Sequence, residues 1–251
     1  MMSSTMHRNQ SGFTLIELAI VLVIIGVLIG SFIGTLGARI DTTRRAEAKA
    51  DLELIKNAIF GYAYTNGAVT GAPFLPCPCV TECVSTVDNP GEEDRDSVSG
   101  VCVADYGYVP WGTLGLKPAD SWNTLYRYWV DPDFSNSVSA FDLADLGSGR
   151  IESRSIDFTK TPLVVSNAVV VIYSHGKNMY GGLSIDGVGR QSIPADNVDE
   201  DKNGNGDSLF FYRVPSPEGT PQAKGGEFDD IVDWISDNEI KARMVEIGML
   251  P

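Results

Sequence analysis

The hydrophobic positions of the chain fall into two different patterns. Between Phe13 and Ala38 nearly every residue is apolar, and Glu17 is the only charged one. At 1.5 Å per residue this stretch would form a helix of about 39 Å, longer than the roughly 30 Å of a hydrocarbon core. The pattern therefore predicts a membrane-spanning helix. A carboxylate inside such a helix costs roughly 2.5–3.5 kcal/mol on insertion scales, so Glu17 needs an explanation.

After Ala38 the apolar residues recur at helical spacing instead. An amphipathic stripe is predicted by positions three or four residues apart: Ala48, Leu52, Ile55, Ile59, Tyr62 and Ala63. We expect one helix of roughly fifty residues from Phe13 to Thr65, with Asn66-Gly67 as its stop signal. Residues 13–38 would be its hydrophobic part and residues 39–66 its amphipathic continuation.

The remainder, residues 67–251, is rich in glycine, proline and short apolar runs. Strands are predicted at Leu125–Val130, Leu163–Ser174, Leu209–Val214 and Ile231–Ile235, with Ser166-Asn167 as a candidate interruption of the second. Ser236 and Glu239 fit a capping box, so a short helix should follow to about Ile247, with Gly248 as its stop. This order predicts an α+β fold in which the long helix packs on an antiparallel sheet.

The composition narrows the class of function. The formal net charge of -14 argues against non-specific nucleic-acid binding, which requires lysine and arginine to neutralise phosphates. An ordinary signal peptide fits poorly, because its apolar region is roughly 7–15 residues long. The sequence holds two histidines and no nucleophile-elbow, phosphate-loop or dinucleotide motif. We therefore expect no enzymatic activity.

The stretch Gly12-Phe13-Thr14-Leu15-Ile16-Glu17 resembles the class III signal of type IV pilins and type II secretion pseudopilins. The resemblance implies that a prepilin peptidase cleaves between Gly12 and Phe13 and methylates the new N-terminus, which removes residues 1–12 as a leader. It also accounts for Glu17. Cleavage creates an amine at Phe13 one helical turn away, and in the family's filaments this carboxylate pairs with the amine of a neighbouring subunit.

The resemblance further implies a structural subunit that requires no cofactor. It would sit in the inner membrane with its C-terminal domain in the periplasm, surrounded by lipid, and then join identical or related subunits on an inner-membrane assembly platform. Two alternatives to a pilus subunit stay open: a pseudopilin that forms a periplasmic piston, and a minor pilin for adhesion or DNA uptake. Many type IV pilins have a helix-breaking proline where this chain has Gly34, so the sequence does not place a kink.

Three later stretches are similar to segments of major pseudopilins: Asp120–Val130, Tyr173–Gly182 and Asp229–Ile235. In the first of them, Asn123 stands where that family usually has glycine, and Ser121 stands where it has proline. These similarities do not decide between a pilus and a secretion system.

Four cysteines follow the hydrophobic segment: Cys77, Cys79, Cys83 and Cys102. In a domain that faces the periplasm or the exterior, two disulfides are favoured, and three pairings are open. We favour Cys77–Cys102 with Cys79–Cys83, because the first closes a long loop and the second staples a short turn. The alternative is a zinc site, although the spacing lacks two Cys-x-x-Cys pairs.

An acidic loop is predicted at Asp196–Asp207. Its residues fill positions 1, 3, 5, 6 and 9 of a calcium-loop pattern: Asp199, Asp201, Asn203, Gly204 and Asp207. Phe210 stands where an EF-hand has its bidentate glutamate, so the loop is not an EF-hand. Major pseudopilins carry a calcium-binding loop late in the globular domain, and Asp229 or Asp230 would complete the ligand shell here. The alternative is a solvated acidic loop.

Overall fold

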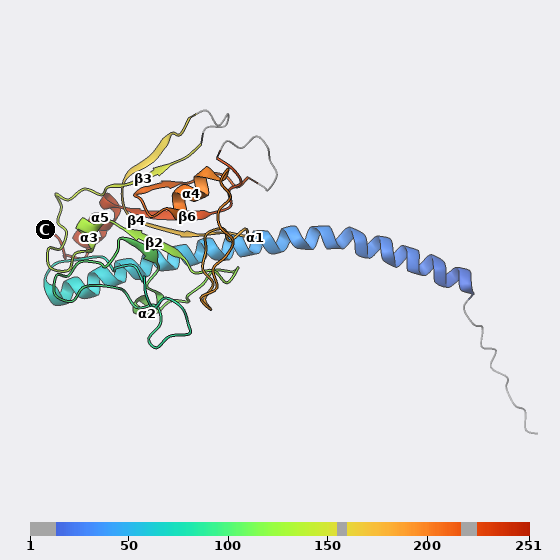
Figure 1. Cartoon of the computed structure of the whole chain (residues 1–251), viewed down its shortest axis with the longest axis horizontal. Helices are drawn as coiled ribbons and strands as arrows, with labels where there is room; N and C mark the ends of the chain where they lie inside the picture. The colour runs from blue at the N-terminus through green and yellow to red at the C-terminus, as the bar shows by residue number, and fades with distance from the viewer. Residues whose placement is uncertain (1–13, 155–159, 217–224) are drawn as a thin grey trace, which may run out of the picture. The chain divides into compact units, whose positions relative to one another are not determined.

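The computed structural model describes residues 14–154, 160–216 and 225–251, and only the backbone of residues 31–36 and 38 (Figure 1). The expected leader and the cleavage site at Gly12 and Phe13 lie outside the described residues. The elements in chain order are α1 (Leu15–Thr70), β1 (Tyr106–Tyr108), α2 (Trp111–Leu114), β2 (Arg127–Val130), α3 (Pro132–Ser135), β3 (Gly149–Glu152), β4 (Leu163–Ser174), α4 (Val198–Gly204), β5 (Leu209–Phe211), β6 (Ile231–Ser236) and α5 (Asp237–Glu246). The chain divides into two units, with the boundary between Thr43 and Arg44. The globular unit therefore includes the second part of α1.

The long helix α1 extends past its predicted end. Asn66-Gly67 does not stop it, because the Asn66 side chain donates a hydrogen bond to the carbonyl oxygen one turn earlier (3.0 Å) and the backbone stays helical to Thr70. The helix ends before Gly71, whose φ of 89° is the left-handed conformation that closes many helices. Gly67 has a packing role instead, since a Cβ atom there would lie 2.7 Å from the Cε atom of Met249.

The sheet has six strands in the described part of the chain. Its order is β1-β2-β4-β3-β5, and β6 pairs with β4. The predicted strand Leu163–Ser174 is β4, with no interruption at Ser166-Asn167, whereas β1 and β3 were not predicted. The expectation of a purely antiparallel sheet was wrong for one pair, since β3 and β5 run parallel. A parallel neighbour needs a long connection, and β5 reaches β3 only after the segment that holds α4.

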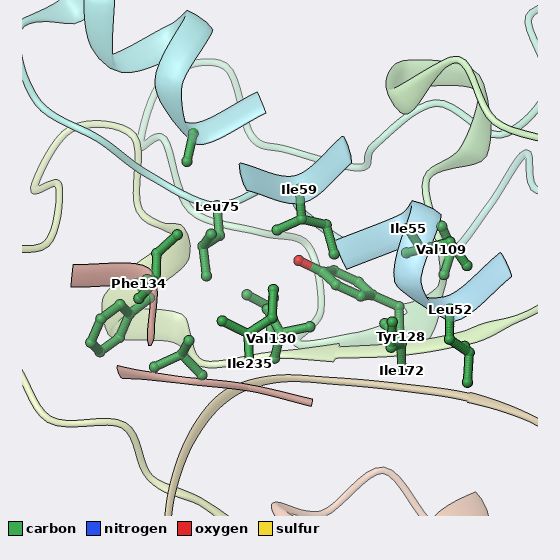
Figure 2. Packing of buried hydrophobic residues seen from close by; sticks show 14 of the residues in the cluster. Leu52, Ile55, Ile59, Leu75, Val109, Tyr128, Val130, Phe134, Ile172 and Ile235 are labelled. Carbon is green, nitrogen blue, oxygen red and sulfur yellow. The ribbon is translucent and has the colours of Figure 1, made fainter. Parts of the chain in front are cut away.

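Alternating side chains give the sheet two apolar faces. Val170 and Ile172 of β4 pack in the larger core with the stripe of α1, whereas Val171 and Tyr173 pack in a second cluster with residues of β3 and β5. Five members of the predicted stripe are buried, and Tyr62 is half-buried; the buried members are Ala48, Leu52, Ile55, Ile59 and Ala63. Figure 2 shows the α1 side chains of this core facing side chains of β2 and β4. The part of α1 in the globular unit therefore covers one face of the sheet, and the second cluster lies on the other face.

The predicted C-terminal helix is α5. Its N-cap is Ser236, whose hydroxyl accepts a hydrogen bond from the backbone N–H of Glu239 (3.2 Å). Gly248 follows the helix with a φ of 73°. The start and the stop that the sequence indicates are therefore both confirmed.

Candidate functional sites

The first candidate site is the start of α1, where Thr14 and Glu17 form reciprocal hydrogen bonds. The Glu17 carboxylate accepts hydrogen bonds from the backbone N–H (2.9 Å) and the hydroxyl (2.8 Å) of Thr14, and the backbone N–H of Glu17 donates to that hydroxyl (3.3 Å). This reciprocal arrangement is a capping box. Our sequence reading missed it, although the Thr-x-x-Glu spacing is its signature. Glu17 therefore has a partner within its own chain.

The apolar side chains that follow Glu17 are exposed in the isolated chain. Leu15 is 91% exposed, and Val23 and Val27 are exposed by about two thirds. Among the residues described, no helical stretch combines the length and the hydropathy that crossing a bilayer requires. The exposed surface continues along the described side chains as far as Ile29.

The second candidate site is a buried acidic cluster in the globular unit. It joins Glu200 of α4 to Asp229 and Asp230, which directly precede β6, and their carboxylate oxygens lie within 4.8 Å of one another. Glu200 accepts hydrogen bonds from the backbone N–H of Asp229 (2.8 Å) and the side-chain amide of Asn178 (3.1 Å). Asp230 accepts one from the side-chain amide of Asn203 (2.7 Å). Segments far apart in the sequence therefore build this cluster.

Burial makes three negative charges in this cluster costly. Loss of solvent raises the pKa of Glu200 to about 7 and that of Asp229 to about 6. It also raises the pKa of Asp230 well above the usual range, and the charge of Glu200 adds to this effect. Protons or a bound cation would remove the repulsion.

The cluster fits a hard cation. One oxygen of Asp229 and the side-chain oxygen of Asn197, which binds Glu200 through its amide, are buried and accept no hydrogen bond. Carboxylate and amide oxygens are the ligands that calcium takes, at 2.3–2.6 Å, so ligands on opposite sides of one ion lie about 5 Å apart. The 4.8 Å spread of the three carboxylates agrees with this geometry.

The residues of the predicted calcium loop do not act together. Residues 198–204 form the helix α4, so side chains that would alternate toward one ion in a loop point in different directions. Asp199 is buried against Arg154 and Arg213, with an ion pair of 2.9 Å to the latter. Asp201 is exposed, and Asp207 pairs with Lys202 (3.2 Å).

The ligand set predicted from the sequence and the buried acidic cluster overlap only in part. Asp229 and Asp230 were proposed from the sequence and belong to the cluster, and Asn203 holds one of them. Glu200 was missed because it lies between the predicted positions 1 and 3, and no local spacing signals its approach to Asp229.

The four cysteines form two disulfides, Cys77–Cys102 and Cys79–Cys83. These are the pairings favoured from the sequence. No cysteine of the described chain is free, so the zinc alternative has no thiolate ligands here.

The segments similar to pseudopilins lie against one another. Asp120 accepts hydrogen bonds from the backbone N–H of Thr124 (2.9 Å) and from the hydroxyl of Ser174 (2.5 Å). Asp229 accepts from the backbone N–H of Lys177 (2.9 Å), which joins the second segment to the third. Asn123 has a φ of 62°. Asparagine tolerates this left-handed conformation better than most residues, which explains how it replaces glycine.

Residues 7–33 match the prokaryotic N-terminal methylation motif. This motif is the prepilin signal of type IV pilins and pseudopilins, so the resemblance inferred from the sequence is confirmed. It supports a pilin-like or pseudopilin protein, a structural subunit that a prepilin peptidase processes and that assembles with related subunits. Comparison with curated proteins and with solved structures found no match. The methylation motif covers Gly12, Phe13 and Glu17.

Proposed function

We propose that the chain is a structural subunit of a type IV pilus-like filament. It would enter the inner membrane through residues 13–38, be cleaved after Gly12, be N-methylated at Phe13 and polymerise through α1. The observation that carries this proposal is the methylation motif at residues 7–33, which stands at the head of an unbroken 56-residue helix.

The exposed apolar surface of α1 supports a change of surroundings during assembly. Its side chains gain from burial at roughly 25 cal/mol per Å² of apolar area, which lipid supplies before assembly and neighbouring helices supply in a filament. Glu17 differs, because lipid offers it no partner. The capping bonds from Thr14 satisfy part of the carboxylate, and the charge itself needs a cation such as the amine of a processed neighbour.

A type II secretion pseudopilin is the second candidate, and the buried acidic cluster favours it. We propose that Glu200, Asp229 and Asp230 hold a structural calcium ion, the property that the resemblance to major pseudopilins implies. The ion would offset two of the three negative charges and fasten α4 to the start of β6. A minor pilin for adhesion or DNA uptake has no comparable observation in its favour among the described residues.

The experiment is expression of the full chain with and without a prepilin peptidase, followed by mass spectrometry of the N-terminal peptide. We expect a peptide that begins at Phe13 and carries one added methyl group. The Gly12→Asp variant, whose side chain obstructs the cleavage site, should keep its leader. Isolation of filaments then separates the candidates, because a pilus subunit would dominate surface filaments and a pseudopilin would stay in periplasmic ones. A full-length, unmethylated wild-type chain would contradict the proposal.

A further inference from the structure

A lysine, an asparagine and an aspartate meet where β4 lies beside the start of α5. One carboxylate oxygen of Asp237, the first residue of α5, accepts a hydrogen bond from the side-chain amide of Asn167 in β4. The other oxygen lies 3.8 Å from the Nζ atom of Lys241, one helical turn further on. Lys241 also donates a hydrogen bond to the carbonyl oxygen of Asp145. An amine and a side-chain amide therefore converge on a single carboxylate, in a group that we call the Lys241 triad.

The amine and the carboxylate of the Lys241 triad are shielded from water. The side chain of Lys241 is 10% exposed and that of Asp237 is 3% exposed. The amine lies 5.8 Å from the centre of the Phe134 ring, and this ring packs against the ring of Phe141 (4.9 Å between ring centres). Desolvation is one of the conditions that make a lysine amine nucleophilic.

The chain holds a second group of the same three residue types at its surface. Lys202 pairs with Asp207 (3.2 Å), and the side-chain amide of Asn205 donates to the same carboxylate oxygen (3.0 Å). In this Lys202 triad the side chains of Lys202 and Asp207 are 38% and 45% exposed. Water stabilises the charged forms of both groups, so we expect an ordinary surface ion pair there. The two triads have the same functional groups and differ in burial.

We propose that Lys241 and Asn167 react to form an isopeptide bond, an internal crosslink between α5 and β4. Asp237 takes a proton from the ammonium group of Lys241, and the electron pair of Nζ then attacks the Cγ atom of Asn167. The flexible stem of lysine lets the amine move from the carboxylate to this carbon. The Nζ–Cγ bond forms and the Cγ–Nδ2 bond breaks. Nζ loses two protons in all, and Asp237 passes both to Nδ2, which leaves as ammonium.

This crosslink would tie the C-terminal helix to the middle of the sheet. β4 pairs with β2, β3 and β6, whereas α5 follows β6 and contacts the sheet through its side chains. A bond between residues 167 and 241 closes a long loop, which restricts the unfolded chain. The inference goes beyond the proposed filament function and does not depend on it, because the reaction needs only the folded globular unit.

The test is the intact mass of the full chain, purified from a host without a prepilin peptidase and then reduced and alkylated. Reduction opens the disulfides but leaves an amide intact, so the mass should be lower than that of the sequence by one ammonia molecule. After trypsin digestion, the peptides that hold Asn167 and Lys241 should appear as one branched peptide. Trypsin should still cleave after Lys202, because the exposed triad does not react.

Four variants identify the reacting groups. Lys241→Arg keeps a positive charge beside the carboxylate but has no primary amine, and Asp237→Asn cannot carry the proton, so both should have the full mass of their sequences. Asn167→Asp should lose water in place of ammonia and give the same branched peptide. Lys202→Arg is the matched control and should still lose ammonia. A purely structural ion pair would leave every mass equal to that of its sequence.

The wild-type mass decides the proposal even where a variant does not fold. A wild-type chain with the full mass of its sequence overturns the crosslink and leaves the filament function standing. A loss of ammonia that persists in Lys241→Arg also overturns it, because an asparagine would then have reacted without this lysine. An unprocessed chain in cells that hold a prepilin peptidase contradicts the proposed function and does not affect the crosslink.

Discussion

The start of α1 and the core of the globular unit both hold carboxylates in costly settings, but they differ in where the partners come from. Glu17 is bound by Thr14, three residues away, on an exposed stretch of helix. Glu200 and Asp229 are buried, and the groups around them come from segments that are distant in the sequence. The first carboxylate lies at an open surface, where the proposed function gives it a partner on a neighbouring subunit, whereas the second pair lies in the interior of the globular unit.

Glu17 and the buried acidic cluster therefore depend on different interactions. A local capping box forms whenever the helix begins, so it contributes to the helix in lipid and in a filament alike. A cluster built from distant segments exists only in the folded unit, so whatever neutralises it is linked to folding. Changes at Glu17 should therefore affect assembly, and changes at the cluster should affect stability.

The largest effect is expected at Glu17. Glu17→Val removes both the cap and the charge and should abolish incorporation into filaments while the chain still inserts into the membrane. Glu17→Gln is the matched control, because its side-chain oxygen still accepts the Thr14 hydrogen bonds but carries no charge. Filament yield by electron microscopy and immunoblotting checks both. If Glu17→Gln assembles like the wild type, the cap is the essential function of this residue and charge pairing is not.

Within the globular unit, one disulfide joins residues that are distant in the sequence and the other joins residues that are close. They span sequence separations of 25 and 4 residues. By loop-closure entropy, loss of Cys77–Cys102 should lower the free energy of unfolding by about 3.5 kcal/mol and loss of Cys79–Cys83 by about 2 kcal/mol. Paired Cys→Ser variants and urea unfolding of the detergent-solubilised chain measure this. Equal losses would show that the crosslinks act on the folded state and not on the freedom of the unfolded chain.

Calcium should stabilise the folded chain through the buried Glu200 and Asp229, and not through the exposed Asp201. At a calcium concentration about 100 times the Kd, binding to the folded state adds about 2.7 kcal/mol to the free energy of unfolding. Glu200→Gln with Asp229→Asn should remove this gain. Asp201→Asn is the control, since Asp201 is exposed on α4 and should leave the gain intact. The opposite result, a loss in the control alone, would restore the loop pattern read from the sequence.

Local signals predicted both ends of α5 but misplaced the end of α1, where Asn66-Gly67 does not stop the helix. Ser236 and Gly248 bound α5 as predicted, because a cap and a left-handed glycine act within one helical turn. Residues 149–152 were missed as a strand, since they form β3 only between β4 and β5. Asp199 was read as a ligand, yet Arg154 and Arg213 hold it, and neither is near it in the sequence.

The candidate sites also show what a contiguous sequence pattern can and cannot predict. The processing site and Glu17 could be recognised because the methylation motif is contiguous. The calcium-loop pattern was also contiguous, but helical backbone at residues 198–204 changes which side chains share a direction. Glu200 becomes a candidate ligand only when the fold brings Asp229 beside it, which no spacing within the loop could show.

The smallest expected effect concerns His175, whose neutral form is fixed by a distant partner. It is buried, and its Nε2 atom accepts a hydrogen bond from the Nε–H of Arg127 (3.3 Å). Loss of solvent, together with the positive charge of Arg127, lowers the pKa of His175 to about 3. The unfolded chain keeps a pKa near 6.5, so between these values only the unfolded state binds the proton.

This contribution of His175 is therefore complete above about pH 6.5 and is lost as the pH falls toward about 3. The loss is about 1.4 kcal/mol per pH unit below about pH 6.5, so about 2 kcal/mol is lost at about pH 5. His175→Gln can still accept the Arg127 bond and does not titrate. Urea unfolding of the wild type and of His175→Gln at about pH 7 and about pH 5 gives the slope of the unfolding free energy against pH for each. The carboxylates are common to both proteins, so their effect cancels in the difference between the two slopes. Identical slopes would mean that His175 takes up a proton within the fold, and the contact with Arg127 would then not hold it neutral.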